Sequence, residues 1–179
     1  MRRSLDLTPN CENCAALCCV VFAFDKSDSF GIDKAACEVC PNLDERDRCR
    51  IFEKRQDLGF GGCITYDCHG AGQRVTHEIF NGNHWRNDPA LKERMGAALS
   101  VLRRIHELLV LLSSTRRLPL SDEESRTLDR LEDILNPDAE WTEETLAVFP
   151  LADVTHEANA FLRSLKHHAG ALTGERPPS

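Results

Sequence analysis

Apolar residues recur at intervals of three and four along the second half of the chain, beginning just after Asp88 and Pro89. This spacing places them on one face of an α-helix, because 3.6 residues make one turn. Asp88 is suited to cap the first turn, and proline is tolerated at the first helical position. The pattern therefore predicts one long amphipathic helix that runs to about Arg117. Its core-facing residues are Leu91, Met95, Ala98, Leu102, Ile105, Leu109 and Leu112.

Two further helices are expected after the long one. Ser121 to Glu124 has the sequence of a capping box, in which the serine and glutamate side chains each bond to the other residue's backbone N–H. That helix should end before Asn136 and Pro137. A last periodic stretch ends near His167. We therefore expect a three-helix or four-helix bundle over residues 89–170, followed by a disordered tail over residues 171–179.

Residues 1–88 lack a sustained period and hold all nine cysteines, which lie between Cys11 and Cys68. The predicted fold class is mainly α, with a small irregular, cysteine-rich, metal-bound module over residues 1–88 that precedes the helical bundle. Only short local elements are expected in this module. They are a helix over residues 11–19, a strand or an extended arm beside the metal site over residues 20–24, a surface helix over residues 44–58 and a short helix over residues 73–80.

The cysteines have the spacing of metal ligands. The chain contains two C-x2-C knuckles, and a knuckle of this kind turns two thiolates toward one ion. If the first segment is helical, Cys11, Cys14 and Cys18 share a face, and Cys19 lies about 100° round the helix from Cys18. The two adjacent cysteines would then serve different centres. The candidate ligands are Cys11, Cys14, Cys18, Cys19, Cys40, Cys49, Cys63 and Cys68, with Cys37 and His69 as possible additional ligands.

The identity of the metal is open between zinc and iron. Thiolate-rich sites suit zinc and iron–sulfur clusters equally well by geometry. Eight thiolates suffice for two four-coordinate zinc sites, and the chain lacks the C-x2-C-x2-C-x3-C-P run of ferredoxins. These two points favour zinc, with a structural or interaction role. The adjacent pair Cys18 and Cys19 argues against two separate zinc sites. An iron–sulfur protein with an electron-transfer or redox-enzyme role is therefore the alternative.

Composition and charge limit the compartments and the partners that we expect for the protein. The net charge of −7 argues against nonspecific binding to nucleic acid or to an anionic membrane. No apolar core follows the two N-terminal arginines, and the longest apolar run, residues 108–112, is too short to span a bilayer. We therefore expect a cytoplasmic protein, in which clustered cysteines bind metal, whereas disulfides in an oxidising compartment are a third possibility. The helical part is expected to bind a protein partner or to self-associate.

Several short motifs carry a resemblance to a known family. They are Cys11-x2-Cys14-x3-Cys18-Cys19, Leu17-Cys-Cys-Val20, Gly59-Phe-x-Gly-Cys63 and Tyr66-Asp-Cys-x-Gly-Ala-Gly-Gln73. The chain resembles the YkgJ-type cysteine-cluster family, described as a zinc- or iron-chelating domain. It is more closely similar to the N-terminal region of actinobacterial pentapeptide repeat-containing proteins. The resemblance covers roughly residues 4–112 and implies metal chelation by a region that precedes a helical segment.

The chain departs from that branch in three places. Cys37 stands where a glycine is usual, which makes it the weakest candidate ligand. Phe52, three residues after Cys49, occupies a position at which that branch often has a histidine. No five-residue repeat occurs after residue 113, so the repeat structure of those proteins is not expected here.

The sequence names no catalytic residue. No nucleophile elbow, P-loop or dinucleotide-binding fingerprint is present. His106 is expected at the boundary of the long helix's core face. His167 and His168 lie near a helix C-terminus, where the dipole favours a positive charge.

Overall fold

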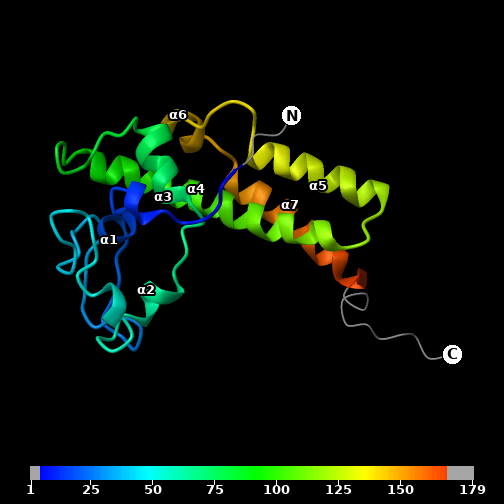
Figure 1. Cartoon of the computed structure of the whole chain (residues 1–179). Coiled ribbons are helices and arrows are strands. Elements are labelled where there is room, and N and C mark those ends of the chain that lie inside the picture. Colours follow the sequence, from blue (N-terminus) through cyan, green and yellow to red (C-terminus); the bar gives the residue numbers. More distant parts are fainter. Residues whose placement is uncertain (1–4, 169–179) are drawn as a thin grey trace.

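The computed structural model describes residues 5–168, and the described part is mainly helical, with three isolated bridges and no sheet. The cysteine-rich region is irregular, as Figure 1 shows, so the predicted mainly α fold with an irregular cysteine-rich region is confirmed. The predicted disordered tail lies outside the described residues. The α-helices are Leu17–Val21 (α1), Gly61–Thr65 (α2), Ala71–Arg74 (α3), Leu91–Ser114 (α4), Asp122–Leu135 (α5), Glu143–Ala147 (α6) and Leu151–Ser164 (α7).

Single turns supplement these helices. The π-helix η3 continues α3, as the sequence predicted for residues 73–80, and η4 extends α4 to Arg117. No helix in the described part of the chain is long and apolar enough to cross a membrane. The turns are Cys11–Asn13 (η1), Phe52–Lys54 (η2), Val75–Ile79 (η3), Thr115–Arg117 (η4) and Leu165–His168 (η5).

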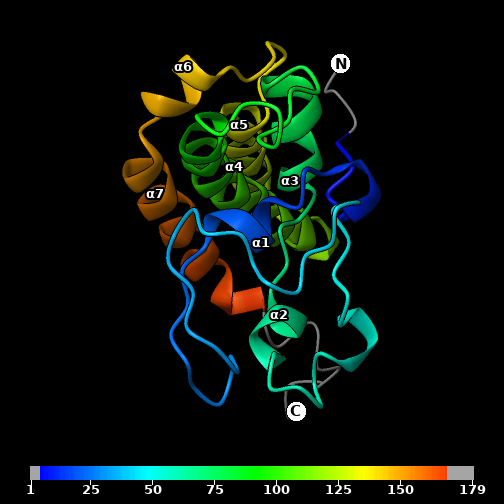
Figure 2. The ribbon, with the colours of Figure 1, turned by 90° about the vertical axis from the view of Figure 1, so that its left-hand side faces the viewer.

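Helix α4 is the centre of the fold. It contacts α1, α3, α5, α6 and α7, and Figure 2 shows these helices surrounding it. The predicted apolar stripe is buried, so the long helix is confirmed. It starts slightly later than predicted, at Leu91, and the Asp88 carboxylate accepts a hydrogen bond from Ala90 N (3.0 Å).

The predicted helices of the bundle are also present. Ser121 Oγ accepts from Glu124 N (3.3 Å), and Glu124 Oε2 accepts from Ser121 N (2.8 Å), which confirms the capping box at the start of α5. Helix α7 covers the last periodic stretch. The sequence did not predict the short α6, which begins with a second capping box at Thr142 and Thr145.

The cysteine-rich region shares its core with the bundle. Leu17, Val20 and Val21 of α1 are buried in the same apolar cluster as the leucines of α4. A glycine allows the close approach, since a Cβ at Gly96 of α4 would lie 3.0 Å from Val21 Cγ1. The boundary at residue 88 stays a prediction, but apolar residues on both sides of it pack together.

The first cysteine segment is not the single helix that the sequence predicted. The turn η1 ends at Asn13, and α1 begins only at Leu17. Between them, Ala16 has φ 51°, a left-handed conformation that residues other than glycine seldom adopt. The predicted alignment of the first three thiols on one helix face is therefore wrong. The predicted strand at residues 20–24 is wrong for its first two residues, because α1 includes Val20 and Val21, whereas Phe22 is extended and Phe24 forms an isolated bridge with Lys34.

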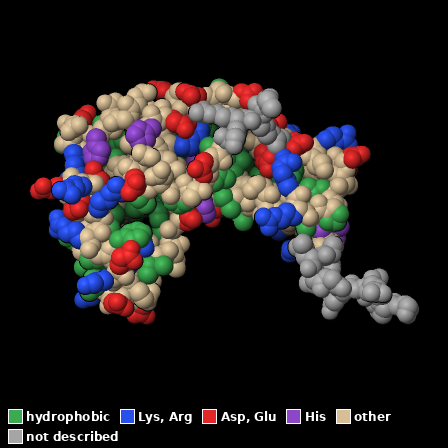
Figure 3. Space-filling model, in the orientation of Figure 1, with side chains coloured by type: hydrophobic (Ala, Val, Ile, Leu, Met, Phe, Trp, Pro, Cys, Tyr) green, Lys and Arg blue, Asp and Glu red, His purple; other side chains and the backbone are tan. Residues whose placement is uncertain are grey.

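The helix predicted over residues 44–58 is also wrong, because a polar side chain competes with the helix. Asp44 Oδ1 accepts hydrogen bonds from the N–H groups of Arg46 and Arg48, both at 2.8 Å. Aspartate favours turns over helix interiors by bonding nearby backbone in this way. The segment is a chain of turns with one 3-10 turn at Phe52–Lys54. Residues 22–68 form an arm that projects from the helical part, with a hollow between the two (Figure 3).

Substitution of Leu17 tests whether α1 contributes to the shared core. Leu17 is fully buried, so Leu17→Ala should lower the free energy of unfolding by about 2–5 kcal/mol, through lost burial and the cavity left behind. Val148 is 81% exposed, so Val148→Ala should change the free energy of unfolding by less than about 0.5 kcal/mol. Urea unfolding followed by circular dichroism measures both. Equal, small effects would mean that α1 contributes little to the core.

Candidate metal centre

All nine cysteines are free thiols, and they lie in the arm and at its junction with the bundle. Cys40 is buried, Cys11 and Cys18 are exposed, and the remaining six are partly buried. Thiols of this kind are donors for soft and borderline metals. Two segments position the thiols. One is α3, and the other is the end of α1.

Cys14 and Cys68 meet at Gly72 of α3. A Cβ placed on Gly72 would lie 2.7 Å from Cys14 Sγ and 3.9 Å from Cys68 Sγ. The space beside this glycine is therefore already filled by sulfur. Both cysteines belong to the predicted ligand set, and the structure brings them together across more than fifty residues.

A glutamine of α3 holds the first knuckle in place. Gln73 Oε1 accepts from Asn10 N (3.0 Å), and Gln73 Nε2 donates to Thr8 O (2.8 Å). Asn10 in turn caps η1, because its side-chain oxygen accepts from Glu12 N and Asn13 N. The backbone just before Cys11 is thus fixed against the helix that follows Cys68.

The peptide groups of Ala15 are held by two side chains from further along the chain. Ala15 N donates to Thr76 Oγ1 (3.1 Å), and Trp85 Nε1 donates to Ala15 O (2.7 Å). Both bonds are buried, and buried backbone groups need such partners. These bonds fix the left-handed turn at Ala16, which sets the direction in which α1 leaves the knuckle. No local sequence signal predicted this break.

The second group of thiols is attached to the other end of α1. Cys40 N donates to Cys19 O (2.9 Å), and Cys37 N donates to Val21 O (3.2 Å). The arm returns to this region at Cys63, whose carbonyl accepts from Arg55 Nη1 (3.1 Å). The second knuckle therefore lies against the residues that follow the first.

A buried lysine lies beside this second group. The Lys34 side chain is only 4% exposed. Its ammonium donates to Val20 O (3.2 Å), Phe22 O (2.5 Å) and Ala35 O (3.1 Å). Burial lowers its pKa, and the neighbouring Cys40 thiol acts in the opposite direction. Since its three donors are used by carbonyls, Lys34 fixes the backbone after α1 and adds a positive charge near the thiols.

Burial makes the thiols reluctant to ionise. It raises the pKa of Cys14 to about 12 and the pKa of Cys63 to about 11. The pKa of Cys18 is raised well above its ordinary value, chiefly by its hydrogen bond to the Cys19 sulfur, 4.0 Å away. Because desolvation penalises the charged form, thiolates here need a compensating cation.

Each knuckle directs a backbone N–H at its second sulfur. After burial, the main influence on the pKa of Cys14 is the Leu17 N–H, which lowers it. In the same way, the Asn42 N–H is the main influence on the pKa of Cys40 after burial, and it lowers that pKa. An N–H donor of this kind stabilises negative charge on sulfur, and such hydrogen bonds tune the potentials of metal-bound thiolates.

The Cys18 thiol is within electrostatic range of both groups. It raises the pKa of Cys11 and Cys14 on one side and of Cys40 and Cys63 on the other, in each case as a smaller influence than burial. Cys11 and Cys14 are also affected by Cys68, and Cys40 and Cys63 by Cys49. The thiols thus form two groups that adjoin at Cys18.

The thiols are further apart than a closed zinc site requires. Bonds of about 2.3 Å place the four thiolates of a zinc tetrahedron about 3.8 Å apart. No three of the nine thiols, all of them described, have their sulfurs within 4.8 Å of one another. The donor chemistry therefore fits a metal site, and the spacing leaves room for more than one metal ion among the thiols.

Of His69 and His106, only His106 departs from the expectation. His69 has φ 48° at the turn after Cys68, and its Nδ1 lies 3.4 Å from Asp67 Oδ1. His106 is fully buried and not at a boundary. Its Nδ1 lies 2.5 Å from His69 O, and its Nε2 lies 2.9 Å from Arg74 Nη1. Since a carbonyl only accepts and a guanidinium only donates, the ring is neutral with its proton on Nδ1.

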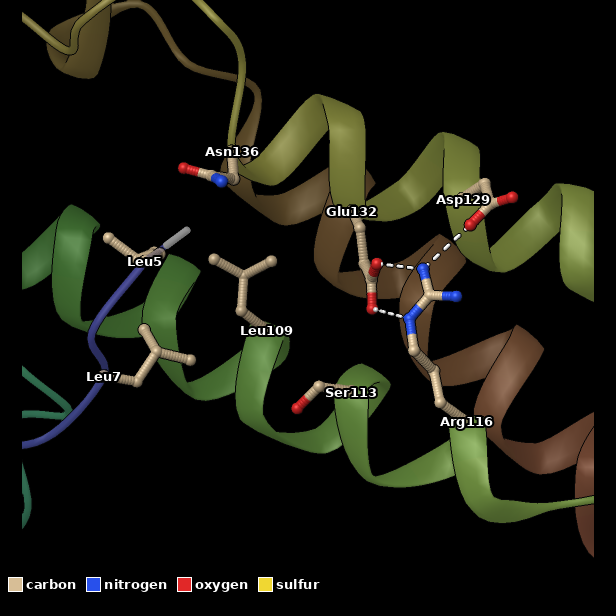
Figure 4. Close-up of a pocket in the computed structure, with 8 residues that line it drawn as sticks. All are labelled: Leu5, Leu7, Leu109, Ser113, Arg116, Asp129, Glu132 and Asn136. Carbon is tan, nitrogen blue, oxygen red and sulfur yellow. Dashed lines mark hydrogen bonds and ion pairs between the residues drawn. The ribbon is translucent and has the colours of Figure 1, made fainter. Parts of the chain in front are cut away.

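A cavity of about 380 Å³ lies away from the thiols, between the N-terminal segment, α4 and α5. Its charged residues are paired, as Figure 4 shows: Arg116 bonds Asp129 (2.8 Å) and also Glu132. Leu5, Leu7 and Leu109 form its apolar side. No cysteine lines it, so its chemistry is separate from the candidate metal centre.

The glycine beside Cys14 gives a direct test. In Gly72→Ala, the new methyl would overlap Cys14 Sγ, so we expect metal affinity to fall at least tenfold, in the range that lost support of a ligand costs. Helix propensity favours the alanine, so any loss is steric. Gly61→Ala is the matched control, because its Cβ would meet nothing closer than Gln56 Oε1 at 3.9 Å. Normal metal affinity in Gly72→Ala would contradict the geometry.

Burial lowers the pKa of His106 to about 4. The unfolded chain takes up this proton near pH 6.5, so the neutral ring stabilises the fold above pH 6.5, and that contribution is lost as the pH falls toward 4. The loss amounts to about 3 kcal/mol. In His106→Gln, unfolding free energy should fall less steeply over this window than in the wild type, whereas the exposed His77→Gln should follow the wild type. Identical pH profiles for His106→Gln and wild type would contradict the buried neutral ring.

The chain is similar to the uncharacterized protein YybG of Bacillus subtilis (strain 168). The two are 33% identical over 131 residues, which are 71% of this chain and 47% of YybG. The chain thus spans about half the length of that relative, to which it is distantly homologous. No family model matches the chain, and no solved structure matches it.

Proposed function

We propose that the chain is a metal-binding protein in which the thiolates between Cys11 and Cys68 bind zinc, and that the metal site serves as a structural or interaction module. The observation that carries the proposal is the pair of knuckles, each with a backbone N–H directed at its second sulfur, at Cys14 and Cys40. The proposed ligands are Cys11, Cys14, Cys18, Cys19, Cys40, Cys49, Cys63 and Cys68, with Cys37 and His69 as additional candidates.

Electrostatics supports a structural role for the metal. Several partly buried thiols with raised pKa values lie close together, and the nearby Lys34 ammonium is used by backbone carbonyls. A bound divalent cation supplies the charge that lets these thiols ionise, and its binding releases their protons. Few buried apolar side chains lie in the arm, residues 22–68, so metal binding would contribute much of its folding free energy.

An iron–sulfur cluster is the second candidate, and the spacing of the sulfurs favours it. In a [4Fe–4S] cluster each thiolate binds a different iron, so the sulfurs lie further apart than around a single zinc ion. The absence of any three thiols within 4.8 Å, among the nine described, agrees with that arrangement. The two groups of thiols adjoin at Cys18, and this supports one bridged metal centre over two independent centres. This candidate would give the chain an electron-transfer or redox-enzyme role.

The proposed interaction surface lies on the helical part. Leu111 of α4 and Val148 after α6 are large apolar side chains that remain 42% and 81% exposed. A protein partner or a second copy of the chain would cover such residues. Metal would then act by fixing the arm relative to the bundle, leaving the helices to make the contact.

Metal analysis with an absorption spectrum on anaerobically purified protein tests the proposal. Zinc bound at about two ions per chain without a visible band supports the zinc module, by the arithmetic of four thiolates per ion. Iron with acid-labile sulfide supports the second candidate. Protein that is folded and metal-free, with its arm resistant to protease, would contradict both.

Single substitutions separate ligands from bystanders. Cys14→Ser should reduce the bound metal and make residues 22–68 sensitive to protease, because the serine hydroxyl is a poor ligand for these metals. Cys37→Ser is the matched control, since Cys37 is the weakest candidate ligand and is also partly buried. Metal analysis and limited proteolysis provide the readouts. Equal metal content in wild type and Cys14→Ser would remove Cys14 from the ligand set.

A further inference from the structure

A second group of metal-ligating side chains lies at the other end of the molecule from the thiols. It joins the first turn of α5 to the turn that follows α7, and these two ends lie side by side in Figure 1. Its members are Glu124, His167 and His168, and their ligand atoms all lie within 4.8 Å of one another. Within the described residues this group meets that limit, whereas no three thiols do.

We propose that Glu124, His167 and His168 form a binding site for a divalent cation of the zinc class, separate from the thiolate centre. Glu124 Oε1 lies 3.4 Å from His167 Nε2 and 3.2 Å from His168 Nε2. Bonds of about 2.0–2.1 Å place nitrogen and oxygen ligands of a zinc tetrahedron about 3.3 Å apart. The two separations thus have the length of tetrahedron edges.

The orientation of the His167 ring supports a cation at this point. His167 Nδ1 lies 2.8 Å from Ser164 O, and a carbonyl only accepts, so Nδ1 carries a proton. The Nε2 of the neutral ring then presents a lone pair to the Glu124 carboxylate, which is unfavourable unless a cation lies between them. Ligating histidines commonly donate their other N–H to a carbonyl in this way. Either a second ring proton or a metal ion satisfies the pair.

The carboxylate is prepared for this role. Ser121 N donates to Glu124 Oε2 (2.8 Å), and this bond is the main reason that the pKa of Glu124 lies below its usual range. Glu124 is therefore ionised and held in one orientation by the capping box, with Oε1 directed at both rings and Oε2 also 3.3 Å from His168 Nε2. The side chains of Glu124 and His168 are 18% and 11% exposed, whereas His167 is 61% exposed. The fourth position of a tetrahedron would thus be open to water.

The chemistry of the site distinguishes it from the thiolate centre. Two imidazoles and one carboxylate suit zinc, cobalt(II) and nickel(II), and no sulfur takes part. A cation here would connect the start of α5 to the end of α7, which are 44 residues apart along the chain at Glu124 and His168. It would stabilise the bundle without any contact with the arm.

Calorimetric titration of zinc into untagged protein whose thiolate centre is already loaded tests the proposal. We expect the wild type to bind one further ion. Glu124→Gln should weaken that binding at least tenfold, since a lost ligand costs more than a lost outer-shell partner. Glutamine still serves at the third position of a capping box, so α5 keeps its cap. The double variant His167→Gln, His168→Gln should lose the ion.

His156→Gln is the matched control, because His156 is an exposed histidine of α7 outside the group. It should bind the further ion as the wild type does. Cobalt(II) bound at the same site should give visible bands without the intense charge-transfer absorption of a cobalt–thiolate bond. The proposal is overturned if loaded wild type binds no further ion, if the ligand variants bind it unchanged, or if the bound cobalt shows thiolate ligation.

Discussion

Burial of several thiols close together is the constraint on which the cysteine-rich half of the molecule depends. Desolvation raises the pKa of Cys14 and Cys63, so each thiol keeps its proton unless a cation compensates the charge. The backbone is already arranged for that cation, with the N–H groups of Leu17 and Asn42 directed at sulfur. A metal ion is the cation that thiolate donors select. The local structure of this half is therefore consistent with metal binding.

This half of the molecule is attached to the bundle by hydrogen bonds. Trp85 and Thr76 hold the peptide groups of Ala15, between the first knuckle and α1. His106 of α4 connects the bundle to the turn after Cys68 through the carbonyl of His69. The His106–His69 hydrogen bond thus links α4 to the turn that follows Cys68.

The elements that sequence predicted well are those set by local rules. The period of α4 and the capping box of α5 depend on residues within one helix, and both are present. Residues 44–58 also carry charges at helical spacing, but the Asp44 side chain bonds the backbone of a turn instead. Contacts between distant residues decided the rest. The left-handed Ala16, the burial of His106 and the meeting of Glu124 with His168 depend on partners that no local pattern reveals.

The same reasoning applies to the ligand set. Spacing alone identified the cysteines as candidates, but it did not reveal that Cys14 and Cys68 meet at Gly72. X-ray absorption at the metal edge of the purified protein tests the central claim, thiolate ligation, most directly. The account predicts a first shell dominated by sulfur at about 2.3 Å from the metal. A first shell of nitrogen and oxygen alone at the metal of the purified protein would contradict it.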